Sequence, residues 1–180
     1  MFYALQTNHY RLQRLEEVYP LASQLASRLP NSTQYVTALY ELLLNALEHG
    51  NLGIGANQKE LLVRDGKWEA EINSRLACAS HKQRYVDVTL IQNHDQYEII
   101  IRDQGEGFNW RAHMMRATQH CQIHGRGLSI ALSAKFDRIF YNAAGNQVTC
   151  LVQHCHWAPS TSEWQLMRWN APLTAKQWAI

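Results

Sequence analysis

The sequence predicts an α+β fold in which one layer of helices covers one face of a mixed, mostly antiparallel sheet. Three observations support this: an apolar segment with helical spacing at residues 34–49, a pair of alternating segments at 85–102, and a second pair at 138–153. Strands joined by short turns pair antiparallel, and helices segregated from such a sheet pack on one of its faces. A two-layer sandwich follows.

The N-terminal half is predicted to be mainly helical. Apolar residues recur at near-helical spacing from residue 10 onward, with an interruption at Pro20. Gly50, Gly53 and Gly55 end the next helix. We expect, in order, a strand at 2–7, one helix or a broken pair at 10–29, a helix at 34–49, and an exposed amphipathic helix at 59–79 that is broken near Gly66.

The C-terminal half changes to a period of two residues, which is typical of strands. A stretch at 109–123 has little regular pattern and separates the two strand pairs. The expected elements are strands at 85–92 and 97–102, a helix at 128–135, and strands at 138–142 and 147–153.

Composition indicates one main domain, because 180 residues with 46% hydrophobic side chains allow one sizeable core and hardly two. We assign this domain to residues 1–156 and a Trp-rich extension to 157–180. We expect the extension to pack on its own sheet or helices, with a homodimer contact as the alternative. Its four tryptophans are Trp157, Trp164, Trp169 and Trp178.

Charge and hydropathy exclude several classes of partner. A formal net charge of +2 with scattered Lys and Arg residues favours no direct nucleic-acid contact. No apolar run approaches the ~20 residues of a membrane span, and no basic segment precedes an apolar one at the N-terminus. We expect a cytoplasmic protein with no membrane contact and with reduced thiols at Cys78, Cys121, Cys150 and Cys155.

The predicted helix at 34–49 contains Glu-Leu-Leu-Leu-Asn-Ala-Leu-Glu-His-Gly at residues 41–50. At ~100° per residue, Glu41, Asn45 and Glu48 fall within an arc of roughly 60°, and apolar residues occupy the rest. Alone, this stripe is typical of the solvent-exposed side of an amphipathic helix. Its carboxylate and amide oxygens are also what a nucleotide and its metal require.

Two glycine-rich segments favour the second interpretation. Asp103 directly follows a predicted strand and can accept a hydrogen bond from the exocyclic amine of adenine, while the Gly-x-Gly after it lets a planar ligand approach the backbone. Gly-Arg-Gly-Leu at 125–128 opens a predicted helix whose free amides can face phosphate oxygens. Each segment alone is explained equally well by an ordinary turn.

In this order and spacing, the three segments resemble the N, G1 and G2 boxes of the GHKL (histidine-kinase-like) ATPase superfamily. Within it, the motif at 41–51 is most similar to the anti-sigma-factor serine-protein kinases of bacterial partner switching. The resemblance covers about residues 10–153. It implies the Bergerat fold, ATP bound under a mobile lid between the last two boxes, and Mg²⁺ bridging the phosphates.

The resemblance also implies a role for each matching residue. Glu41 is the expected catalytic base, Asn45 the Mg²⁺ ligand within the cofactor site, and Asp103 the adenine-binding residue. Glu48 and His49 match the motif too, either at the rim of the site or in a capping or packing role. The other expected cofactor-binding residues shape the pocket or reach the phosphates: Gly105, Gly107, Gly125, Arg126, Gly127 and Leu128.

Some positions depart from the family pattern. His124 stands where the family often has glycine, no acidic residue lies beside Phe108, and the segment at 59–79 is an insertion relative to the shortest members. His9 lacks the acidic neighbour of a phosphoacceptor histidine, so any acceptor is expected to be a separate protein.

We therefore expect an ATP-dependent serine/threonine kinase that phosphorylates a small antagonist protein and binds a sigma factor or other regulator. One alternative is a nucleotide-gated protein-binding module with little or no turnover. A second is an interaction domain with a degenerate site, which the departure at His124 favours.

Overall fold

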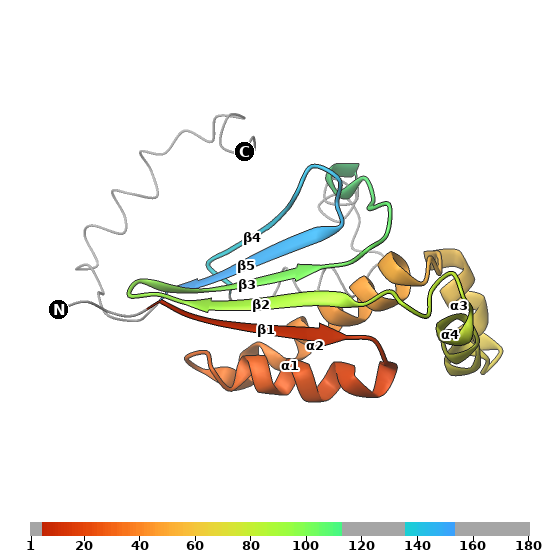
Figure 1. Cartoon of the computed structure of the whole chain (residues 1–180), viewed down its shortest axis with the longest axis horizontal. Coiled ribbons are helices and arrows are strands. Elements are labelled where there is room, and N and C mark those ends of the chain that lie inside the picture. The colour runs from red at the N-terminus through yellow and green to blue at the C-terminus, as the bar shows by residue number, and fades with distance from the viewer. Residues whose placement is uncertain (1–4, 113–135, 154–180) are drawn as a thin grey trace.

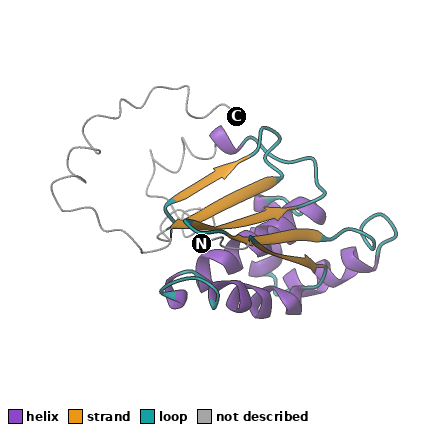
Figure 2. Ribbon diagram, turned by 60° about the vertical axis from the view of Figure 1, so that its left-hand side comes forward, coloured by secondary structure: helices purple, strands orange, loops and turns teal. Residues whose placement is uncertain are grey.

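The computed structural model describes residues 5–112 and 136–153. This part of the chain forms two layers, a five-stranded antiparallel sheet with the order β1-β2-β3-β5-β4 and helices that cover one of its faces (Figures 1 and 2). The predicted α+β class is confirmed. The sheet differs from the expected mixed one, because every pairing between described strands is antiparallel.

The second to fifth strands lie within about a residue of their predicted bounds. Burial alternates regularly at residues 86–90, as expected for a strand with one covered face. The first strand was predicted too early, and its second half was assigned to a helix. Leu12 pairs opposite Val86, so cross-strand pairing overrides the helical spacing read from this segment. The strands are β1 (Gln6–Leu12), β2 (Val86–Gln92), β3 (Gln96–Arg102), β4 (Arg138–Tyr141) and β5 (Gln147–Gln153).

The helices also follow from local sequence. Pro20 lies in the first turn of α1, where the missing N–H leaves no helical bond unmade, so the helix is not interrupted there. Gly66, with φ of +66°, separates α3 from α4 close to the predicted break. The helices are α1 (Val18–Ala26), α2 (Val36–Asn45), a π-helical turn (Ala46–Asn51), α3 (Ala56–Arg64) and α4 (Trp68–Ala77).

The core lies between the α1–α2 layer and the covered face of the sheet. It contains fully or almost fully buried side chains from both layers, among them Leu25, Leu39, Leu43 and Leu47 from the helical segments and Val88, Ile99, Ile101 and Val152 from the strands. Burying a side chain of this size contributes about 1.5–3 kcal/mol. These contacts fix α2 against the sheet and determine which of its side chains remain accessible.

Several expectations concern residues outside the described part: the helix at 128–135, the Trp-rich extension at 157–180, and Cys121 and Cys155. Of the described cysteines, Cys78 is exposed and Cys150 is buried, and both are free thiols. Burial raises the pKa of the Cys150 thiol above its ordinary value. Within residues 5–112 and 136–153, we find no helix with the length and apolar character of a bilayer span.

Candidate functional site

The polar side of α2 is the first component of the site. Glu41 and Asn45 lie one helical turn apart and are both partly exposed, whereas Leu42, Leu43 and Leu44 between them are buried. Neither polar side chain forms a hydrogen bond or ion pair with another described residue. Within the described part of the chain nothing therefore occupies their oxygens, and the roles expected for these two residues remain predictions.

Glu48 does not lie on the exposed polar side of the helix with Glu41 and Asn45. Regular α-helix ends at Asn45, and the turn that follows has a wider i→i+5 bond from the Leu52 N–H to the Leu47 carbonyl at 3.0 Å. Each residue of a π-turn advances by less than 100°, so the phase assumed for a regular helix is lost. The Glu48 side chain is 0% exposed and bonds within the protein, so it does not belong to the exposed stripe and has the packing role that the sequence left open.

Asp103, directly after β3, is the second component. Its side chain is 9% exposed, and its Oδ1 accepts a hydrogen bond from the Gly105 N–H at 2.8 Å. Desolvation raises the pKa of this carboxyl, while the Gly105 N–H, its own N–H, and Arg102 and Arg84 oppose the shift. No described residue donates to Oδ2. A buried carboxylate with one unused oxygen is suited to bind a donor from outside the protein.

Gly50 brings these two components together. A Cβ at Gly50 would lie 2.3 Å from Cγ of Asp103, and a Cβ at Gly105 would lie 2.3 Å from the Gly50 carbonyl oxygen. Both distances are shorter than any real Cβ contact, so only glycine permits this approach. The end of the helical segment that carries Glu41 and Asn45 therefore packs directly on the loop that carries Asp103.

Asn51 strengthens this contact and was not identified from the sequence. Its Oδ1 accepts the Gln104 N–H at 2.7 Å, and its backbone carbonyl accepts a bond from Nη1 of Arg84 at 2.9 Å. The side chain is 1% exposed, and its Nδ2 has no hydrogen-bond partner within the described part of the chain. From the sequence, only its place directly after Gly50 at the end of the predicted helix would have pointed to it.

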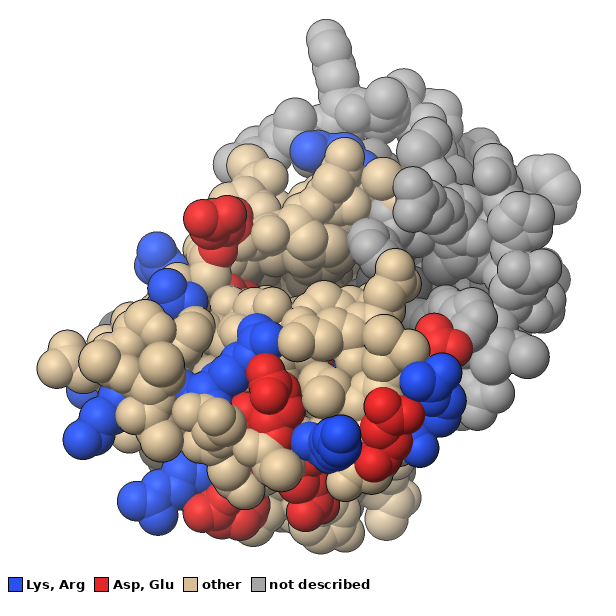
Figure 3. Space-filling view, turned by 90° about the vertical axis from the view of Figure 1, so that its right-hand side faces the viewer, with Lys and Arg blue, Asp and Glu red and all other residues tan. Residues whose placement is uncertain are grey.

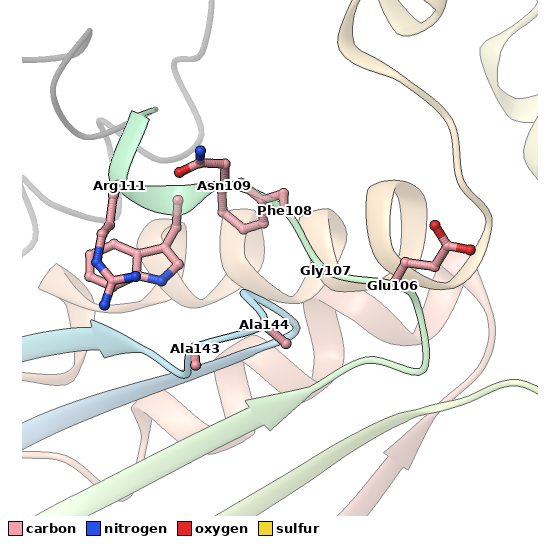
Figure 4. Close-up of a pocket in the computed structure, with 8 residues that line it drawn as sticks. Glu106, Gly107, Phe108, Asn109, Arg111, Ala143 and Ala144 are labelled. Atoms are coloured by element: carbon pink, nitrogen blue, oxygen red, sulfur yellow. The ribbon is translucent and has the colours of Figure 1, made fainter. Parts of the chain in front are cut away.

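Gly107 places the next part of the loop against the β4–β5 turn. Its φ is +82°, and an added Cβ would lie 2.0 Å from the Ala144 carbonyl oxygen, which also accepts the Phe108 N–H at 3.1 Å. Figure 4 shows Phe108, Asn109 and Arg111 on the segment that passes over Ala143 and Ala144. The loop and the turn line an open hollow of about 390 Å³.

The predicted site residues are thus only partly assembled in the described structure. Asp103 and Gly105 line a second hollow of about 320 Å³ together with Asn146, and Gly107 lines the first. Glu41 and Asn45 line neither hollow and lie on the helix that leads to the Gly50 contact. The remaining predicted residues lie outside the described residues: Gly125, Arg126, Gly127 and Leu128.

The described residues offer an amide oxygen rather than a preformed metal cage. No group of three or more His, Cys, Asp or Glu side chains within residues 5–112 and 136–153 is placed to hold a metal ion. Mg²⁺ does not need such a group, because it binds through one or two side-chain oxygens plus phosphates and water. The partly exposed Asn45 amide fits that donor set.

Comparison with known proteins adds no further assignment, because no protein-family model and no curated protein matches this chain.

Proposed function

We propose that this chain is an ATP-binding regulatory protein with the Bergerat fold of histidine-kinase-like ATPases, and that it phosphorylates a serine or threonine of a small antagonist protein. The contact between Gly50 and Asp103 carries the proposal. This contact connects two parts of the proposed site. One is the helical segment that carries Asn45, the candidate residue for the phosphates, and the other is the buried Asp103 carboxylate, the candidate residue for adenine. The proposed setting is bacterial partner switching in the cytoplasm, with a sigma factor or other regulator as a second partner and a second copy of the chain as a further candidate partner.

Asp103 supplies base recognition in this proposal. Oδ1 is occupied by the Gly105 N–H, and Oδ2 is left for the exocyclic amine of adenine. Guanine has its C6 carbonyl oxygen, an acceptor, in the place of the exocyclic amine of adenine, so the carboxylate selects adenine. A hydrogen bond to a charged group contributes about 1.5–3 kcal/mol, which corresponds to a discrimination of roughly tenfold or more.

Asn45 and Glu41 act at the phosphates. The Asn45 amide oxygen would hold Mg²⁺, which supplies neutralisation of phosphate charge when bound. Glu41 accepts the proton of the attacking Ser or Thr hydroxyl as that oxygen bonds to the γ-phosphorus and the bond to the β,γ-bridging oxygen breaks. ADP and a phosphorylated partner result. The one-turn spacing of the two residues on α2 supports this division of roles.

The nucleotide site is tested by calorimetry with ATP and Mg²⁺. We expect wild-type protein to bind and Asp103→Ala to lose most of its affinity while it retains its fold by circular dichroism. Absence of binding in wild type, or the same affinity in Asp103→Ala, would show that the site is wrongly assigned.

Kinase activity is tested with labelled ATP and candidate antagonist proteins encoded by neighbouring genes. The proposal expects label on a partner Ser or Thr, and expects it to disappear in Glu41→Ala. Tight ATP binding with neither transfer nor hydrolysis would instead identify a nucleotide-gated binding module.

A further inference from the structure

A buried carboxylate joins the π-turn to the α3–α4 hairpin. Glu48 is 0% exposed, and its two oxygens accept bonds from Nζ of Lys59 in α3 at 2.6 Å and from Nε1 of Trp68 in α4 at 2.8 Å. The Lys59 ammonium also lies 5.8 Å from the centre of the Trp68 ring. Each oxygen of one carboxylate is therefore bound by a different helix of the hairpin.

Stability alone is a poor explanation for this arrangement. Removing a carboxylate from water costs several kcal/mol, and apolar residues of similar volume are often as stabilising as a buried ion pair. The two hydrogen bonds instead fix the orientation of the turn that bears Glu48, because their donors come from two different helices. The charge of Glu48 is compensated by Lys59, whose Nζ lies 2.6 Å from Oε2. Figure 3 shows basic and acidic side chains interspersed on the surface of the side where α3 and α4 lie.

The turn that Glu48 fixes is the one that touches Asp103. Gly50 lies two residues after Glu48, and the Glu48 carbonyl accepts the Ile54 N–H at 3.0 Å. Arg75 of α4 adds a second attachment, from its Nη1 to the Leu52 carbonyl at 2.8 Å. The hairpin, which lies beyond one end of the sheet in Figure 1, therefore holds the turn on both sides of Gly50.

We infer that Glu48, bound by Lys59 and Trp68, is a positioning residue that sets the π-turn against Asp103 and so couples the α3–α4 hairpin to base recognition. The inference rests on the proposed function, because Asp103 is taken as the base-binding residue. A rotated turn would move Gly50 away from the carboxylate and open the space in which the base is selected.

The test compares ATP with inosine triphosphate, whose C6 oxygen cannot donate to a carboxylate. Trp68→Phe removes one donor to Glu48, and the double variant Glu48→Gln/Lys59→Met removes the ion pair without leaving an unpaired buried charge. Wild type should prefer ATP by roughly tenfold or more. Both variants should bind ATP more weakly and reduce that preference to about threefold or less.

Ile72→Val is the matched control, because Ile72 is a 0% exposed residue of α4 outside the Glu48 network. It should destabilise the hairpin by about 0.5–1.5 kcal/mol and keep the wild-type nucleotide preference. Structural damage alone lowers affinity for both nucleotides equally, so the ratio of the two dissociation constants reports positioning. If Trp68→Phe does not fold, the nucleotide preference of the double variant Glu48→Gln/Lys59→Met decides whether Glu48 is a positioning residue.

The outcomes separate this inference from the proposed function. If wild type binds ATP no better than inosine triphosphate, or if Asp103→Ala keeps the preference, both are overturned. If wild type prefers ATP and Asp103→Ala loses the preference, but the folded network variants keep it, only the coupling through Glu48 is overturned.

Discussion

Gly50 and Asp103 approach so closely that a Cβ on Gly50 would lie 2.3 Å from Cγ and 2.5 Å from Oδ1 of the carboxylate. The contact joins two parts of the chain that are more than fifty residues apart in sequence. Asp103 is buried, and Gly105 packs on the carbonyl of Gly50, so the carboxylate has little room to withdraw. The geometry of the candidate base site therefore depends on residue 50 being a glycine, which has no side chain.

Gly50→Ala should test this dependence directly. The added methyl forces Asp103 or the π-turn to shift, and overpacking of this kind costs about 1–3 kcal/mol. We expect lower stability to urea and weaker ATP binding. Gly55→Ala is the control, because its Cβ would meet no heavy atom within 4 Å, and its cost should stay below about 1 kcal/mol. Equal effects of the two substitutions would contradict the close packing at Gly50.

The fold was predictable where local periodicity and tertiary packing agree. Side chains at residues 86–90 of β2 alternate between buried and more exposed, and the glycine near residue 66 marks the turn between α3 and α4. The prediction was wrong for residues 10–12, because their apolar spacing fits a helix, whereas the pairing of Leu12 with Val86 makes them part of a strand. Pairing partners distant in sequence leave no local signal.

The pKa of Asp103 predicts how stability depends on pH. Because desolvation disfavours the charged carboxylate, the folded state holds its proton to a higher pH than the unfolded chain. The stability contributed by the protonated form is present below the unfolded pKa and is lost as pH rises through the folded pKa.

Asp103→Asn keeps an acceptor for the Gly105 N–H but cannot ionise, so it isolates this effect. The stability of wild type minus that of Asp103→Asn should fall as pH rises from below the ordinary aspartate pKa to neutrality. Urea denaturation across that range measures the difference. A difference that grows with pH would mean that the folded structure stabilises the charged form.

The placement of candidate site residues was predictable where it needs only helical spacing or a strand end. Glu41 and Asn45 are partly exposed on α2, and Asp103 follows β3, whereas their roles remain predictions. For Glu48 the sequence left a rim position and a packing role open, because no residue pattern signals that the α-helix changes to a π-turn at residue 46, and the structure shows the packing role. Asn51 was missed because its bond to the Gln104 N–H depends on tertiary structure.

Asn45→Ala should uncouple nucleotide binding from Mg²⁺. Alanine favours helix, so the fold should be retained. We expect wild type to bind ATP roughly tenfold more tightly in Mg²⁺ than in EDTA, and the variant to bind about equally in both, because the amide oxygen is a hard ligand of the kind Mg²⁺ takes. Calorimetry gives the dissociation constant of ATP in Mg²⁺ and in EDTA.

Asn57→Ala, at an exposed position of α3, is the control and should show the same Mg²⁺ effect as wild type. A persisting Mg²⁺ effect in Asn45→Ala would remove Asn45 from the metal site.

Lys59→Met should destabilise the protein more than the double variant Glu48→Gln/Lys59→Met. The single change leaves the Glu48 carboxylate, which is fully buried, with Trp68 as its remaining donor. Breaking a buried pair in this way costs about 3–5 kcal/mol, but the Lys59 side chain is 29% exposed, so solvent screening reduces the expected loss to on the order of 2 kcal/mol.

The double variant removes both charges, and the amide introduced by Glu48→Gln retains an oxygen that can accept the Trp68 N–H. It should therefore recover at least half of the stability lost in Lys59→Met, measured as the free energy of unfolding in urea at neutral pH. If the double variant is as unstable as the single one, the cost comes from lost packing of the lysine stem rather than from an uncompensated charge. In that case the carboxylate is not what holds the hairpin to the π-turn.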